Sequence, residues 1–262
     1  MACSGEMKNA AEAVKPGHAG RLVVDAPIRM FHALFAVCFF GAWLTSESEA
    51  WRSLHVTLGY GMGGLLLFRV VYGLFGPPQA RLYLLFGRLM GLPTTLAGVF
   101  RAGWASGNAN RAPLLGTLQN VSMAATILAL IVLAAVAGVS GYLAWNDAPE
   151  WVAELHEESG EALINLGVIH IALVLGFSLL RKRNMAATML TGRIAGPGPS
   201  LVRHNRVWLA VVMLVAVLAF TAYDLRQTSV ETSAEHDSAR IFGEGEEHHA
   251  DRKERYGHSD NE

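Results

Sequence analysis

Charged residues are scarce in this chain of 262 residues, and their scarcity excludes an ordinary soluble domain. Asp, Glu, Lys and Arg make up 16% of the sequence, whereas soluble domains contain about 25%. All four residue types are absent from four long segments, 30–46, 112–146, 162–180 and 207–223. A fifth segment, 53–75, contains Arg69 as its one charged residue. Long uncharged apolar segments are typical of membrane-spanning helices.

Cysteine is also scarce, since the chain contains only Cys3 and Cys38. Cys3 lies near the N-terminus and Cys38 lies within an apolar segment. This pattern excludes a disulfide-stapled fold and the Cys-x-x-Cys-His motif of covalent cofactor attachment.

The apolar segments predict an all-α membrane protein. Each is close to or above the roughly 17–25 residues that a helix needs to cross the hydrocarbon core. Helices are favoured because the bilayer has no water to satisfy open strand edges. Five transmembrane helices are expected, the last of them the shortest: Ile28–Leu44, Leu54–Phe75, Leu118–Leu143, Ala153–Leu180 and Val207–Tyr223.

Lysine and arginine predict the orientation of these helices. Positive residues gather before the first helix, between the second and third, and between the fourth and fifth, while the opposite short loops contain only Arg52. Because cytoplasmic loops carry the excess of positive charge, we expect a cytoplasmic-membrane protein with a cytoplasmic N-terminus and an extracytoplasmic C-terminal tail.

Four histidines lie near the ends of the apolar segments, where an ionisable side chain is costly and indicates function. His32 lies near the cytoplasmic end of the first helix, and His55 begins the second at the outer face. His156 and His170 both lie on the fourth helix, 14 residues apart, or roughly 21 Å along one face. Their expected depths in the membrane therefore pair His55 with His156 at the outer side, and His32 with His170 at the inner side.

Paired histidines at two depths predict two haem b groups, each with two axial imidazole ligands. Such a centre has no open position for substrate, so it predicts electron transfer rather than catalysis by the chain alone. Zinc or copper is the alternative, but these metals usually take Cys, Asp or Glu ligands as well, and none lies at these depths.

Glycines accompany the histidines on the same helix faces. Gly59 and Gly63 follow His55 by four and eight residues, and Gly160 and Gly167 lie between the histidines of the fourth helix. Missing side chains beside a ligand leave room for a flat macrocycle, although small residues also serve helix packing. Among the cations, Arg29 and Arg69 are candidates to bind haem propionates, or else they anchor the inner membrane face.

The chain divides into four expected parts. Residues 1–27 form a cytoplasmic segment and residues 28–190 the four-helix haem-binding core. Residues 191–224 hold a linker and the fifth helix, and residues 225–262 are a polar, acidic outer tail. Within the core, residues 82–100 are expected to lie along the interface as an amphipathic helix that is broken at Pro93.

The chain resembles the bacterial cytochrome b561 and nickel-hydrogenase b-type cytochrome superfamily. The resemblance rests on Asp25-Ala-Pro-Ile-Arg-Met-Phe-His32, Trp51-Arg-Ser-Leu-His55-Val-Thr-Leu-Gly-Tyr60, Leu67-Phe-Arg69, Gln79-Ala-Arg81 and the later His156 and His170. It implies a four-helix core with two b haems, a quinone site, and a c-type cytochrome or dehydrogenase partner. The chain departs from the family at Val24, where Trp is common, and at 116–120, which lacks the family's loop histidine.

We therefore predict electron transfer between the quinone pool and an outer-face partner. The alternatives are a free-standing superoxide:quinone oxidoreductase and a membrane anchor that receives electrons from a dehydrogenase or hydrogenase. Acidic residues surround the expected outer haem, and a negative rim attracts a basic protein but repels superoxide. This favours a c-type cytochrome; the acidic residues are Glu47, Glu49, Asp147, Glu150, Glu154, Glu157, Glu158 and Glu161.

Overall fold

The computed structural model describes residues 20–91, 93, 97–98, 111–194, 199–202 and 204–227. Within these residues, five helices are long and apolar enough to cross a membrane, which confirms the expected all-α membrane fold. They are α2 (Ala26–Thr45), α3 (Arg52–Phe75), α6 (Arg111–Trp145), α7 (Glu150–Leu180) and a C-terminal helix, Val207–Gln227. The expectation that the last helix is the shortest is wrong, because it has 21 residues and α2 has 20.

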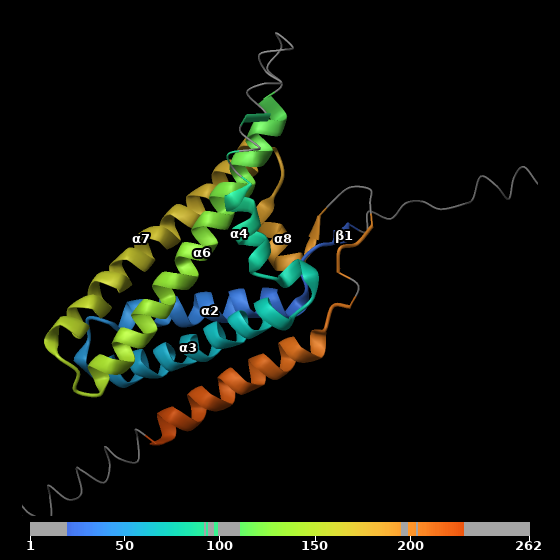
Figure 1. Ribbon diagram of the computed structural model, residues 1–262. Coiled ribbons are helices and arrows are strands. Elements are labelled where there is room, and N and C mark those ends of the chain that lie inside the picture. The colour runs from blue at the N-terminus through green and yellow to red at the C-terminus, as the bar shows by residue number, and fades with distance from the viewer. Residues whose placement is uncertain are drawn as a thin grey trace, which may run out of the picture.

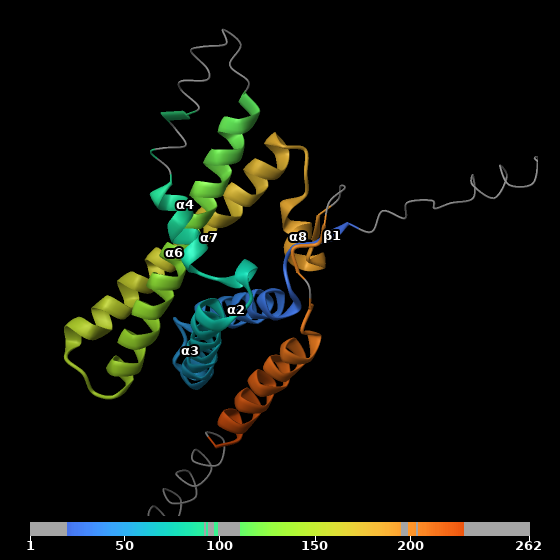
Figure 2. The ribbon, with the colours of Figure 1, turned by 45° about the vertical axis from the view of Figure 1, so that its right-hand side comes forward.

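The helices form two antiparallel pairs, α2 with α3 and α6 with α7 (Figure 1). The pairs meet mainly through α3 and α6. The C-terminal helix lies beside the first pair, on the side away from α6 and α7, in both views (Figures 1 and 2). We call the end at which α3 begins the His55 end of the bundle, and the end at which α2 begins the His32 end.

Short elements gather mainly at the His32 end. Two-residue strands β1 (Arg21–Leu22) and β2 (Arg193–Ile194) pair antiparallel, with Arg21 opposite Ile194. Helix α8 (Met185–Thr191) precedes β2 and ends at Gly192, whose φ of 73° requires the conformational freedom of glycine. The other short helices are η1 (Glu49–Trp51), η2 (Pro78–Ala80) and α4 (Tyr83–Met90).

Helix α4 makes up most of the described part of the expected interfacial segment 82–100. It begins at Tyr83 and ends at Met90, with Gly91 as its C-cap. Most of the remainder of that segment, the first 19 residues of the chain and the tail from residue 228 lie outside the described residues.

A buried polar cluster fastens the C-terminal helix to the core at the His32 end. Asp25, which has no exposed surface, caps α2 by accepting a hydrogen bond from the Ile28 backbone. Its carboxylate also accepts one from the Tyr72 hydroxyl of α3. Arg206, at the start of the C-terminal helix, donates to that hydroxyl over 3.3 Å. Since each buried group has a partner, the cluster joins three segments without an unsatisfied carboxylate.

A second polar contact fastens the opposite end of the same helix. The hydroxyl of Thr57, a fully buried residue of α3, donates to the Asp224 carboxylate. Between the two contacts, Met213 packs with Cys38 and Leu65 in a buried apolar cluster. These contacts make the C-terminal helix antiparallel to α3, so that Asp224 lies at the His55 end.

Candidate functional site

His55 and His156 are each held by a backbone carbonyl of the neighbouring helix in their own pair. The Nδ1 atom of His55 lies 2.8 Å from the Ala42 carbonyl oxygen of α2. The Nδ1 atom of His156 lies 2.8 Å from the Ala137 carbonyl oxygen of α6. A carbonyl only accepts, so Nδ1 carries the proton in each ring and Nε2 keeps a free lone pair. Metal-binding histidines commonly show this arrangement.

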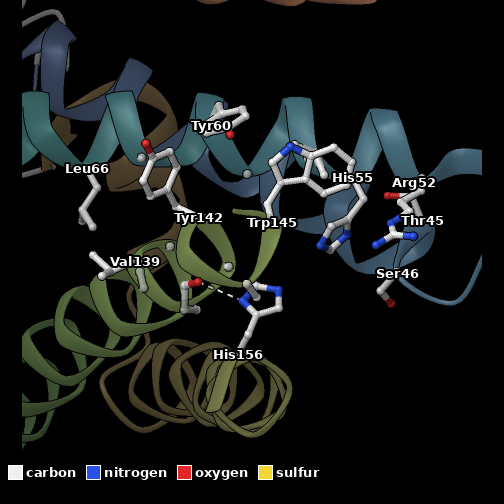
Figure 3. A pocket seen from close by; sticks show the side chains of 18 of the residues that line it. Thr45, Ser46, Arg52, His55, Tyr60, Leu66, Val139, Tyr142, Trp145 and His156 are labelled. Carbon is white, nitrogen blue, oxygen red and sulfur yellow. Dashed lines mark hydrogen bonds between the residues drawn. The ribbon is translucent and has the colours of Figure 1, made fainter. Parts of the chain in front are cut away.

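The two rings approach one another across the gap between the helix pairs (Figure 3). Their centroids are 6.0 Å apart and their planes are inclined by 85°. Two metal–nitrogen bonds of about 2 Å, with a ring radius of roughly 1 Å added on each side, separate two axial imidazoles by about 6 Å. The spacing therefore fits two ligands on one metal ion.

A cavity of about 840 Å³ surrounds this pair of rings (Figure 3). Its volume lies within the range of pockets that hold small molecules and cofactors, roughly 300–1,000 Å³. Residues without bulky side chains line much of it, including Gly59, Gly63, Gly64, Ala134 and Gly138. A Cβ atom added at Gly59 or Gly63 would meet no atom within 4 Å, so these glycines border open space and not a packed helix interface.

Gly141 of α6 is a site residue that the sequence did not reveal. A Cβ atom there would lie 2.7 Å from Cε1 and 2.8 Å from Nδ1 of His156. The missing side chain lets the ring approach α6 closely and reach the Ala137 carbonyl. Because α6 contains no histidine, nothing in the sequence around Gly141 indicated a ligand nearby.

The other two histidines, His32 of α2 and His170 of α7, lie towards the His32 end. Their rings are near enough to interact through charge. His32 is exposed, whereas the Nδ1 atom of His170 is buried and has no hydrogen-bond partner. A buried nitrogen without a partner is costly, so one nitrogen of this ring is available to a further group.

The two arginines expected near the cofactor differ in what they contact. Arg29 donates from Nη1 to the Leu190 carbonyl over 2.9 Å, while its Nε is buried and without a partner. Arg69 donates from Nη1 to the Ala80 carbonyl over 3.2 Å, and its charge acts on the buried Asp25. Arg29 thus keeps an unused donor in a buried place, whereas Arg69 lies within the cluster that holds the C-terminal helix.

The eight acidic residues expected around the outer site are all exposed, and they lie at the His55 end of the bundle. Glu154, Glu157, Glu158 and Glu161 follow the i, i+3, i+4, i+7 spacing that places them on one face of α7. At the same end, the Arg52 guanidinium stacks over the Trp145 ring at 5.3 Å. In the described part of the chain, no three His, Cys, Asp or Glu side chains converge as a metal site usually requires.

Apolar spanning helices with two imidazoles close together in a cofactor-sized cavity define a class of protein, the membrane b-type cytochromes of electron transfer. Comparison of the sequence with protein families narrows the class. The chain belongs to the prokaryotic cytochrome b561 family, whose profile matches residues 23–192. Neither a search of curated proteins nor a search of solved structures returned a match. The matched region includes all four histidines and ends before the C-terminal helix.

Proposed function

We propose that the chain holds two b haems and carries electrons across the cytoplasmic membrane between the quinone pool and a c-type cytochrome at the outer face. In this proposal His55 and His156 bind the outer haem iron, and His32 and His170 bind the inner one. Haem b held by two imidazoles exchanges single electrons and offers no position to a substrate. The observation that carries the proposal is the 6.0 Å separation of the His55 and His156 rings.

The chain's own residues prepare the outer site for a planar group. The Ala42 and Ala137 carbonyls keep the proton on Nδ1 of each ring, which leaves Nε2 as the nitrogen that can bind a metal and raises its basicity as a ligand. Gly59 and Gly63 leave space beside His55. At the other end, the unused Nε donor of Arg29 is suited to a carboxylate such as a propionate. Arg69 is the second candidate for that role.

The proposed orientation puts the His55 end outside the membrane. Lys and Arg are concentrated in the segments at the opposite end, and such segments stay in the cytoplasm. The eight exposed carboxylates then surround the outer haem site. The positive-inside rule explains why Lys and Arg are rare at this end, but it does not explain why Asp and Glu are abundant. These carboxylates therefore support a basic protein partner. They disfavour superoxide, which is an anion and would be repelled.

A count of haem in the purified protein tests the central proposal. We expect two b-type haems per chain by pyridine haemochrome assay, and two steps in a spectroscopic redox titration. The steps need not have equal midpoints, since the two histidine pairs differ in burial and hydrogen bonding. A single haem per chain in the full-length protein would contradict the two-centre proposal.

A salt series tests the proposed partner. We expect electron exchange with a basic c-type cytochrome to slow by about tenfold as ionic strength rises, because salt screens the attraction of the carboxylates. The combined variant Glu154→Gln, Glu157→Gln and Glu158→Gln should slow the reaction at low salt and flatten its salt dependence. Stopped-flow absorbance in the haem bands measures both effects.

An acidic c-type cytochrome is the matched control for this experiment. Its rate should rise with salt, since screening removes repulsion. Rates that are flat in both salt series would show that the exposed carboxylates do not guide a partner, and would remove the argument for a basic one.

A further inference from the structure

The cavity around His55 and His156 has a polar end and an apolar end (Figure 3). Leu66 and Val70 line the apolar end, about four to five turns along α3 from its start. A planar cofactor that carries charge at one edge would place that edge at the polar end, because burying a charge among apolar side chains is costly. The polar end lies where α2 ends and α3 begins, and its lining residues are Thr45, Ser46, Glu47, Ser48, Glu49 and Arg52.

Arg52 is a cation without an anionic partner in this lining. Among the described residues that line the cavity, it is the one lysine or arginine. Within the described part of the chain its guanidinium makes no hydrogen bond and no ion pair, although Glu47 and Glu49 line the same end. It stacks instead over the Trp145 ring, whose centroid lies 5.3 Å away. The five N–H donors of the guanidinium are therefore available to a further group.

The position of Arg52 runs against two general trends. It lies in the first turn of α3, where the positive end of the helix dipole disfavours a cation. It also lies at the proposed outer end, where short loops rarely carry Lys or Arg. The contact with Trp145 of α6 nevertheless holds the guanidinium beside the cavity, and it joins the two helix pairs there. A fixed cation in an already positive place is suited to binding an anion.

We propose that Arg52 binds a propionate of the haem in the outer site and that Trp145 positions it; the proposal rests on the proposed function and adds two residues to that site. A propionate is a carboxylate, which a guanidinium binds through two parallel hydrogen bonds. Glu47 and Glu49 would repel a propionate at this end, so a cation is needed to offset them. Arg29 cannot take this role, because it lies at the opposite end of α2.

A spectroscopic redox titration of the full-length, haem-loaded protein in phosphatidylcholine nanodiscs tests this role. Loss of a positive charge beside a haem favours the oxidised form, since ferric haem carries one more positive charge than ferrous haem. Arg52→Gln should therefore lower one of the two midpoint potentials and leave the other unchanged. We expect about a tenfold change in the oxidised-to-reduced ratio, or about 59 mV. Arg52→Lys keeps the charge and should retain most of the original midpoint.

Resonance Raman spectra distinguish a direct contact from a distant charge. The propionate bending band should shift in Arg52→Gln and also in Arg52→Lys, because an ammonium group cannot replace the two parallel hydrogen bonds. Trp145→Leu should change the oxidised-to-reduced ratio of the same haem by a smaller factor, about threefold, since the guanidinium loses the ring that holds it. Trp145→Phe keeps an aromatic face and should leave this ratio unchanged.

Arg226→Gln is the matched control, because it removes the same charge at the same end of the bundle. Arg226 is an exposed residue of the C-terminal helix. It lines neither this cavity nor a second one that lies between α3 and the C-terminal helix. This variant should keep both midpoints and the Raman band.

The outcomes separate this inference from the proposed function. Unchanged midpoints in Arg52→Gln, with both haems retained, would overturn the inference, and so would an equal shift in Arg226→Gln. A shift that appears only when the nanodiscs contain phosphatidylglycerol would assign Arg52 to a lipid phosphate and would overturn it too. Loss of one haem in Arg52→Gln, with two retained in Arg52→Lys and Arg226→Gln, would support it. A single haem in the unaltered protein contradicts the proposed function, whereas two haems that do not respond to Arg52 contradict this inference alone.

Discussion

Replacement of His55 or His156 by alanine is expected to remove one of two b haems and to leave the other. Each substitution would delete one of the two proposed iron ligands, and the remaining ring, still hydrogen-bonded to its carbonyl, would supply only one. The double variant should lose no more haem than either single variant, because the two rings act as one site. His32→Ala and His170→Ala should remove the other haem. Pyridine haemochrome assays and low-temperature spectra of the reduced protein measure the losses.

His204→Ala is the matched control, since His204 is an exposed histidine outside the spanning helices. It should retain both haems. If the double variant His55→Ala, His156→Ala lost clearly more haem than either single change, the two histidines would serve different centres, and the pairing would be wrong. Full haem content in either single variant would also contradict it.

Gly141→Ala is expected to displace the His156 ring and to release the same haem. The new Cβ atom would lie 2.7 Å from the ring, so the ring must move away from α6 and lose its hydrogen bond to Ala137. Alanine is a better helix former than glycine by about 1 kcal/mol. The loss therefore cannot be attributed to a weaker α6. Haem content should fall from two towards one per chain, and the remaining spectrum should match that of His156→Ala.

The same substitution elsewhere on α6 separates this effect from a general one. At Gly116 an added Cβ atom would meet nothing within 4 Å, and this residue does not line the haem-sized cavity. Gly116→Ala should keep both haems. Equal haem loss in the two variants would show that α6 tolerates no alanine at its glycines, and the contact with His156 would then not be the cause.

Much of the architecture followed from the sequence because the bilayer imposes a simple rule on charge. Segments without Asp, Glu, Lys or Arg had to become helices, and five such helices are present among the described residues. Their ends were less predictable. Helix α6 begins at Arg111 and α7 at Glu150, outside the predicted spans that began at Leu118 and Ala153. Hydropathy measures only the part of a helix that lipid surrounds, and polar residues can continue the same helix into water.

The depth of each histidine also followed from the sequence, because the rise of a helix is constant. The approach of the His55 ring to the His156 ring did not, since it depends on how the two helix pairs pack. The sequence predicted that Gly59 and Gly63 leave space beside His55, because all three residues lie on one face of the same helix. It could not predict Gly141, whose partner His156 lies on the next helix and meets it only in the folded bundle.

The sequence by itself determined that this protein is an all-helical membrane protein with four histidines at two depths, because charge and helical periodicity are properties of single segments. Only the tertiary structure distinguished Arg29, with its unused donor, from Arg69, which lies beside Asp25. It also decided that the C-terminal helix joins α3 through Thr57 and Asp224 and leaves a second cavity between them. These features depend on contacts between residues up to 167 positions apart, and no local pattern in the chain specifies which distant segments will pack together.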